Sequence, residues 1–501
     1  MKNISNYLSK IPVADWFWTG AALVFIISLL LFFEIATRRW GWNRTGSRKA
    51  VHLIVGLLIC TTPLIFSSKV PLIILSFLFI TINLWAIKTR HLTGIHPNDQ
   101  SYGTVFYPIS ILILDILFWP AHMMIFVLST SIMVIADTMA ALIGNNYASR
   151  FYIIYEEKKS IPGTITMYIT SVILLLAGVQ IFIANRLLDN VLLALLVGAI
   201  ATAAELISKK GSDNFSVPLL VALFLYGFLG PAATVIHWQL IIGILLAALI
   251  AGLSYRWHFL KLNGAVITFL LGAVIFGFGG IKYTIPVLAF FIFSSLLSKA
   301  GKHKKMELES SFEKSGVRDL SQVLANGGMA GILVILIFIF QRNDWYPQYL
   351  AGLAVATADT WATELGVFSR SKPRMITTFE QVAAGVSGAI SLLGSLAAVA
   401  GSCFILLSGL YFLRAAGQSS LDIIVIIIGS GVLGSFIDSF IGATIQAQYR
   451  CRICHKSTEK RIHCQQEAHL VRGNVFITND LVNFISIMVG TMICFIMMVY
   501  V

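Results

Sequence analysis

The chain has 501 residues, of which 57% are hydrophobic and only 12% are charged. Soluble domains carry roughly 25% charged residues, so this composition excludes a soluble globular, a disordered or a disulfide-stapled secreted protein. The net charge of +13 does not indicate nucleic-acid binding, because basic residues in a membrane protein first report topology. We therefore expect an all-α polytopic membrane protein that binds no nucleic acid.

Apolar runs near the length needed to cross a bilayer recur along the whole chain and predict about 16 transmembrane helices, at ~20 residues per span. The predicted helices start near residues 16, 50, 70, 103, 121, 162, 188, 215, 238, 263, 281, 321, 347, 384, 421 and 476. With this placement, most of the 36 Lys and Arg residues fall in alternate loops. Basic loops stay in the cytosol, so both termini are expected to be non-cytosolic.

One short pattern occurs twice in the sequence. Residues 136–144 and 358–366 both contain Ala-Asp-Thr, an alanine two places later and a closing glycine. After each copy come a basic, hydroxyl-rich loop, an acid late in a span, and an Asp/Asn pair at the start of another span. These residues are Lys159, Ser160, Gly163, Glu205, Asp213 and Asn214 after the first copy, and Thr377, Thr378, Asp438, Asn479 and Asp480 after the second. The copies predict two parallel, related eight-span halves, residues 1–254 and 255–501.

The two repeated aspartates, Asp137 and Asp359, lie near the predicted cytosolic ends of apolar spans. A carboxylate there is costly unless it is paired or ligating. The structural alternative is an acid satisfied by Thr or Asn neighbours, but its recurrence favours function. Carboxylate and hydroxyl oxygens suit Mg²⁺, which adds phosphate oxygens to few protein ligands, and the loops that follow offer cations, hydroxyls and N–H groups for phosphate. We predict phosphate chemistry at the cytosolic face, with Mg²⁺ on the two aspartates.

Three further groups of polar residues each have a functional and a structural interpretation. An acid late in a span is a metal ligand, a base that activates an alcohol, or a packing acid. An Asp/Asn pair at a span start binds nucleotide or metal, or caps its helix, and juxtamembrane basic residues contact substrate or anchor the span. The residues are Glu205 and Asp438, the pairs 213–214 and 479–480, and Arg48 with Lys49.

A polar loop before the last span contains Cys451-x-x-Cys454, followed by His463-Cys464. Three thiolates and one imidazole, from His463 or His455, suit tetrahedral Zn²⁺. Free thiols in a reducing compartment are the alternative, but so polar a loop has little else to hold it folded. The closed set of four ligands predicts a structural zinc site.

Residues 48–218 resemble the phytol kinase and dolichol kinase family, membrane enzymes that phosphorylate isoprenoid alcohols with CTP. The resemblance rests on Arg48-Lys49 with His52, Gly103 with Tyr107-Pro108, and the segments 136–144, 159–163, Glu205 and 213–218. Residues 263 to about 490 look like the family that includes phytyl-phosphate kinase, which adds the second phosphate. That second match rests on Arg318-Asp319, Asn326-Gly327, the segment 358–364, Thr377-Thr378, Asp438, the Cys/His loop at 445–475 and Asn479-Asp480.

The resemblance implies a bifunctional isoprenoid-alcohol kinase that makes a diphosphate in two steps, with its active sites facing the cytosol. The first half would phosphorylate an alcohol such as phytol or geranylgeraniol from CTP, and the second half would phosphorylate the monophosphate. We expect the catalytic residues to be Asp137, Lys159, Glu205, Asp359 and Asp438. The expected nucleotide- and phosphate-binding residues are Arg48, Lys49, Ser160, Gly163, Asp213, Asn214, Arg318, Asp319, Asn326, Thr377, Thr378, Asn479 and Asp480.

Two other functions fit parts of the same pattern. A CTP-dependent lipid cytidylyltransferase would use the same Mg²⁺ and nucleotide groups for attack at the α-phosphate. A transporter of isoprenoid phosphates could also be built from two parallel halves. The headgroup of the product separates a kinase from a cytidylyltransferase, and a transporter would consume no CTP.

Overall fold

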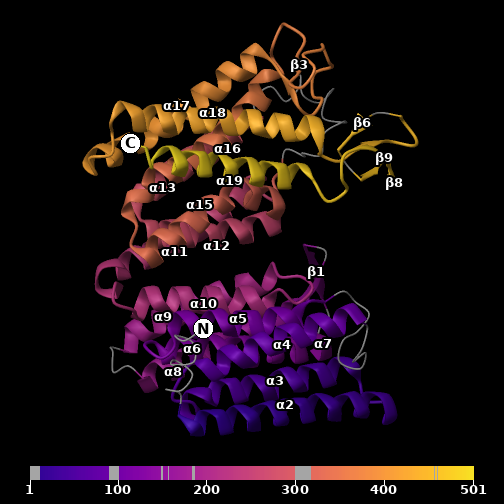
Figure 1. Ribbon diagram of the computed structural model, residues 1–501, viewed down its shortest axis with the longest axis vertical. Helices are drawn as coiled ribbons and strands as arrows, with labels where there is room; N and C mark the ends of the chain where they lie inside the picture. Colours follow the sequence, from indigo (N-terminus) through magenta and orange to yellow (C-terminus); the bar gives the residue numbers. More distant parts are fainter. Residues whose placement is uncertain are drawn as a thin grey trace, which may run out of the picture. The chain divides into compact units, whose positions relative to one another are not determined.

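The computed structural model describes residues 12–89, 101–147, 150–155, 157–182, 187–299, 317–455, 457–459 and 461–500 (Figure 1). This part of the chain is mainly helical, and 13 of its helices are long and apolar enough to cross a membrane. The predicted all-α polytopic class is therefore confirmed.

The chain divides into two compact units, Met1–His237 and Trp238–Val501. The described helices of unit 1 are α2 (Val13–Arg39), α3 (Arg44–Ile65), α4 (Val70–Thr89), α5 (Gly103–Phe118), α6 (Met123–Ser131), the π-helix η1 (Ile132–Ala136), α7 (Asp137–Tyr147), α8 (Ile161–Phe182), α9 (Leu187–Leu206) and α10 (Asp213–Leu229). Helix α11 (Ala233–Arg256) crosses the division between the units. Unit 2 continues with α12 (Leu262–Gly279), α13 (Ile281–Lys299), α15 (Leu320–Phe340), the 3₁₀ turn η2 (Asn343–Trp345), α16 (Tyr346–Gly366), α17 (Leu392–Ala415), α18 (Leu421–Thr444) and α19 (Asn479–Met497).

Helices α6, η1 and α7 are continuous and together form one of the 13 spans, Met123–Tyr147. Three other helices fall outside the 13 spans. Helices α5 and α10 are apolar but shorter, with 16 and 17 residues. Helix α16 has 21 residues, and its buried first part is followed by the polar turns that hold Asp359 and Glu364.

One predicted span begins later than expected. The start predicted near residue 384 lies at Leu392. Gly385 and Gly388 have φ of +89° and +83°, a conformation that glycine adopts without steric cost. The preceding stretch is therefore a loop rather than the first turns of a helix.

The helices that follow α5 and α15 pack in the same order. In unit 1, α7 packs on α8, α8 on α9, α9 on α10, and α10 on α5. In unit 2, α16 packs on α17, α17 on α18, α18 on α19, and α19 on α15. In each unit, the last helix of this series therefore packs against the first one: α10 against α5, and α19 against α15.

Short strands lie between these helices. In unit 1, β1 (Phe151–Ile154) and β2 (Glu157–Ser160) form an antiparallel hairpin directly before α8. In unit 2, β3 (Arg374–Met375) pairs with β4 (Ala389–Ile390). The remaining strands are β5 (Gln448–Arg450), β6 (Ser457–Thr458), β7 (Ile462–His463), β8 (Gln466–Glu467) and β9 (His469–Arg472). Strands β6, β5 and β9 form a three-stranded sheet in that order, and β7 and β8 form a hairpin.

Candidate active site

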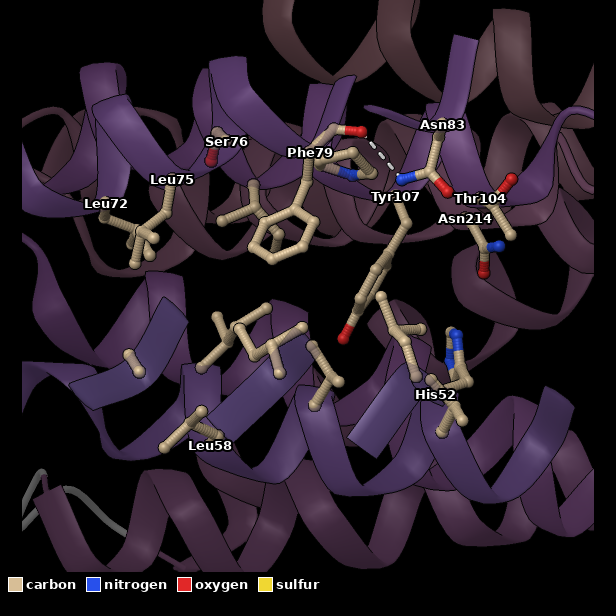
Figure 2. A pocket seen from close by; sticks show the side chains of 18 of the residues that line it. His52, Leu58, Leu72, Leu75, Ser76, Phe79, Asn83, Thr104, Tyr107 and Asn214 are labelled. Atoms are coloured by element: carbon tan, nitrogen blue, oxygen red, sulfur yellow. Dashed lines mark hydrogen bonds between the residues drawn. The ribbon is translucent and has the colours of Figure 1, made fainter. Parts of the chain in front are cut away.

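Unit 1 contains a cavity of about 370 Å³, here called the unit 1 cavity, that is charged at one end and apolar along its body. Helices α2, α3, α4 and α5 supply most of its wall. In Figure 2, His52, Asn83, Thr104 and Asn214 lie toward one end, whereas Leu72 and Leu75 lie toward the other. The charged residues at the polar end are Arg48, Lys49, Asp137 and Asp213.

The apolar body of this cavity follows the length of α3. Lining residues run from Arg48 in the first turns of this helix to Ile65 at its end, about 26 Å at 1.5 Å per residue. That is most of the ~30 Å hydrocarbon thickness of a bilayer. Trp18 of α2 and Phe66 line the cavity as well, so the body is enclosed by aromatic and aliphatic side chains.

Lys49 and Asp137 face each other at the charged end. Nζ of Lys49 lies 3.7 Å from Oδ2 of Asp137, and both side chains are largely buried. The π-helix η1 ends one residue before this aspartate. A π-turn inserts an extra residue into a helix and often occurs at functional sites. The extra residue in η1 therefore rotates the direction in which the side chain of Asp137 points from the helix.

The β1–β2 hairpin places Lys159 against α9. Nζ of Lys159 donates to Oε1 of Glu205 at 2.5 Å and to its backbone oxygen at 3.0 Å. Burial disfavours the charged amine, but the Glu205 carboxylate outweighs this effect and raises the pKa of Lys159. Lys159 is therefore a fixed cation.

Asp213 and Asn214 form the first turn of α10. Within the described part of the chain, Oδ1 of Asp213 is buried without a hydrogen-bond partner, as are Oη of Tyr107 and Oγ1 of Thr138. Asn214 donates from Nδ2 to the backbone oxygen of Gly103 at 3.0 Å. Of the residues predicted for the first half, five line the unit 1 cavity: Arg48, Lys49, Asp137, Asp213 and Asn214. The Lys159–Glu205 pair does not line it but interacts electrostatically with Asp213.

Ser160 and Gly163 join α8 to α7 instead of lining the cavity. Oγ of Ser160 accepts a hydrogen bond from N of Gly163 at 3.2 Å, as an N-cap does. A Cβ on Gly163 would lie 2.8 Å from that oxygen, 3.0 Å from the oxygen of Ala140 and 3.3 Å from Cα of Gly144 on the facing helix. Only glycine fits this contact.

The same contact recurs in unit 2 between α16 and α17. Oγ of Ser391 accepts from N of Gly394 at 3.1 Å, and a Cβ on Gly394 would lie 3.1 Å from the oxygen of Ala362. The repeat within the sequence predicted that Thr377 and Thr378 correspond to Ser160, but both threonines are exposed and neither lines the unit 2 cavity described below. The Ser-x-x-Gly spacing that both units share was the sequence signal that could have located this contact.

Unit 2 has a cavity of about 160 Å³, here called the unit 2 cavity, that holds three of the predicted residues. Asp359 from α16, Asp438 from α18 and Asn479 from α19 line it. Ser486 donates to Oδ2 of Asp438 at 3.2 Å, and Nδ2 of Asn479 is buried without a partner among the described residues. Glu459 lines the same cavity and carried no signal in the sequence.

The other predicted residues of unit 2 lie elsewhere. Arg318 and Asn326 line a separate, mostly apolar cavity of about 60 Å³ among α11, α12, α13 and α15. Asp319 caps α15 by accepting from N of Gln322 at 3.3 Å. Asp480 lies in the first turn of α19, outside the unit 2 cavity.

The four predicted zinc ligands come together in the loop between α18 and α19. One ligand atom from each lies within 4.8 Å of all the others. We call Cys451, Cys454, His463 and Cys464 the Cys/His cluster. N–H groups of Cys454 and Ile453 donate to Sγ of Cys451 at 3.5 and 3.4 Å, and they lower the pKa of this thiol to about 6. His455, the alternative imidazole, is not in the cluster.

Fold and sites define a polytopic α-helical membrane protein with charged cavities that its transmembrane helices enclose. The chain belongs to the family described as integral membrane protein DUF92, whose profile matches residues 245–491.

Three relatives illustrate its similarities. Protein PGR from Arabidopsis thaliana is 32% identical over 286 residues, which cover 53% of this chain and 98% of that protein. Phytol kinase from Synechocystis sp. is 26% identical over 217 residues, covering 42% of this chain and 90% of that protein. Protein VTE6, chloroplastic, from Arabidopsis thaliana is 22% identical over 244 residues, or 48% of this chain and 65% of that protein. No solved structure matches the chain.

Proposed function

We propose that this protein is an isoprenoid-alcohol kinase that makes a prenyl monophosphate in unit 1 and a diphosphate in unit 2, with CTP as the phosphoryl donor. The shape and polarity of the unit 1 cavity carry the proposal. A long apolar body that ends in a cluster of two basic side chains and two carboxylates matches a molecule with a hydrocarbon tail and a reactive polar head. Similarity to proteins named phytol kinase supports the same substrate class.

The charged end fits Mg²⁺ and phosphate. Asp137 supplies carboxylate oxygens, and the neighbouring Thr138 has a buried Oγ1 without a partner in the described residues. Hard oxygen ligands of this kind suit Mg²⁺, so Asp137 would hold the ion. Bound Mg²⁺ would neutralise phosphate charge and orient the transferring group.

The other charged residues at this end, and the Lys159–Glu205 pair that interacts with them, have separate roles in the proposed reaction. Lys49 and Lys159 bind phosphate oxygens, and Glu205 holds Lys159 in place through the 2.5 Å contact. The alcohol oxygen forms a bond to the terminal phosphorus of the nucleotide, the bond from that phosphorus to the bridging oxygen breaks, and the nucleoside diphosphate leaves. The hydroxyl proton passes to Oδ1 of Asp213, which is buried and accepts no hydrogen bond from the described residues. Positioning and charge neutralisation supply most of the rate in such transfers.

The second step is assigned to the unit 2 cavity. Asp359 follows the same Ala-Asp-Thr pattern as Asp137, and each lies seven residues before the glycine, Gly366 or Gly144, that packs at the Ser-x-x-Gly contact. Asn479 offers a buried donor and Asp438 a second carboxylate. Carboxylates suit a cation bound to phosphate, and the amide donor suits a phosphate oxygen. A prenyl monophosphate and a nucleotide would both bring such phosphates.

Two neighbouring residues of α3 provide a matched test. Leu58 lines the unit 1 cavity, whereas Leu57 is 45% exposed on the outer face of the same helix. Purified protein in detergent would be incubated with CTP, Mg²⁺ and a panel of prenols of increasing length, and mono- and diphosphates would be resolved. Leu58→Trp is expected to lower kcat/KM for long prenols by at least about tenfold relative to short ones, because the indole fills the body.

Leu57→Trp should leave that preference unchanged. Wild-type protein that forms no phosphorylated prenol from any nucleoside triphosphate would show the proposal to be wrong. A cytidine-containing product would instead assign the cytidylyltransferase reaction.

A further inference from the structure

The Cys/His cluster has the dimensions of a tetrahedral metal site. Nδ1 of His463 lies 3.6 Å from Sγ of Cys454 and 3.2 Å from Sγ of Cys464. A sulfur and a nitrogen bound to one tetrahedral zinc, at 2.3 and 2.1 Å from it, are about 3.6 Å apart. The two sulfur-to-nitrogen distances therefore leave room for one ion at the centre.

The turn that presents two of these ligands is a strained one. Cys464 and Gln465 connect β7 to β8, and their φ angles are +51° and +62°. A two-residue hairpin turn with positive φ at both positions usually takes Asn and Gly, and other L residues adopt it at a cost. Coordination of His463 and Cys464 by one ion would offset this cost.

Glu459 joins this loop to the unit 2 cavity. It directly follows β6, whose Thr458 pairs with Tyr449 of β5. Oε1 of Glu459 accepts from Nε2 of Gln446 at 3.0 Å. Gln446 is 1% exposed, and its Oε1 accepts from Ser387 at 2.9 Å. A continuous chain of hydrogen bonds thus runs from the loop to the 385–391 wall of the cavity.

We propose that the Cys/His cluster binds Zn²⁺ and that the ion holds Glu459 in the unit 2 cavity. Glu459 lies between the second ligand, Cys454, and the third, His463, so the ion closes a short loop around it. Closing a loop lowers its conformational entropy. The proposal concerns structure alone and holds whichever reaction the cavity performs.

The metal content of the full chain tests the first part of this proposal. Protein purified in detergent without chelators should contain one zinc per chain by mass spectrometry. Cys454→Ser should lose it, whereas Cys403→Ser, which removes a cysteine of α17 outside the cluster, should keep it. If Cys454→Ser does not fold, wild-type protein treated with a strong chelator gives the second measurement. Folded wild-type protein without zinc would overturn the proposal.

Hydrogen–deuterium exchange tests the second part. Removing zinc should speed exchange in both the Cys/His loop and residues 385–391 by about tenfold, the effect of losing one buried hydrogen bond. Glu459→Ala should retain zinc and still speed exchange at 385–391, because Gln446 loses its acceptor. Glu467 is an exposed residue of β8 that pairs with Arg461, so Glu467→Ala should change neither the zinc content nor the exchange at 385–391. Unaltered exchange at 385–391 after zinc removal would overturn the link between zinc and Glu459.

Discussion

At the scale of single residues, the Lys159–Glu205 pair has a consequence for pH dependence. The carboxylate raises the pKa of Lys159 above its ordinary value, against the effect of burial. Its charged form is therefore retained as the pH rises, and is lost only when the pH passes that raised pKa. We predict that wild-type alcohol kinase activity has no falling limb from this lysine in the neutral and mildly alkaline range.

Glu205→Gln should move that limb to lower pH. Without the carboxylate, burial of the amine becomes the larger effect, and it lowers the pKa of Lys159. At neutral pH we also expect kcat/KM to fall on the order of 10²-fold, the usual effect of losing one positioned charge. Profiles of kcat/KM against pH would be measured for both proteins. Asp189→Asn, an exposed acid at the other end of α9, is the control, and an identical profile for Glu205→Gln would refute the assigned role of this pair.

The residues that line the two cavities show how far sequence reasoning reaches. Charged residues within apolar spans are few, and each must be satisfied, so Asp137, Asp359 and Asp438 could be found from their setting alone. Glu459 could not be found, because its position depends on the register of β6 against β5 rather than on any neighbour in sequence. Asn83 of α4 was equally hidden in a long apolar run.

At the scale of helices, most starts could be predicted because a bilayer demands long apolar runs. The exception was α17, where the glycines of the 385–391 loop break the run before Leu392. The walls of the unit 1 cavity could not be predicted, since α2 and α4 are apolar all round and periodicity does not distinguish their faces. Lipid-facing and cavity-facing leucines look alike in sequence.

The Ser-x-x-Gly contacts lead to an unequal effect of one substitution in the two units. A Cβ on Gly144 would lie 2.6 Å from Oγ of Ser160 and 3.3 Å from Cα of Gly163. On Gly366 it would lie 3.4 Å from Oγ of Ser391 and 3.6 Å from Cα of Gly394, which is ordinary contact. Gly144→Ala is expected to cost about 1–3 kcal/mol of stability, as overpacking does, and Gly366→Ala less.

Thermal unfolding in detergent would measure the difference between these variants. Gly252→Ala is the control, because among the described residues its added Cβ has no neighbour within 4 Å beyond the adjoining backbone of its own helix, and alanine favours a helix over glycine by about 0.5–1 kcal/mol. That variant should be neutral or stabilised. Equal losses for Gly144→Ala and Gly366→Ala would mean that the α7–α8 contact is no tighter than the α16–α17 contact.

At the scale of the whole chain, each of the two units has a charged site of its own. Each encloses its own acids in its own cavity, and the two charged sites share no residue. The 136–144 and 358–366 repeats lead from sequence to both sites. A protein with two such sites can perform two successive reactions, and single substitutions can separate them.

One aspartate in each unit tests this division directly. Asp137→Asn keeps the size of the side chain and removes its charge, so it should abolish phosphorylation of the free alcohol yet leave conversion of prenyl monophosphate intact. Asp359→Asn should do the reverse, with monophosphate accumulating from the alcohol. Losing a charge that holds Mg²⁺ at the transferring phosphate should slow the affected step by about a thousandfold. Misfolding would lower both activities together, so each variant is the control for the other. A normal rate of diphosphate formation by Asp359→Asn would remove unit 2 from the second step.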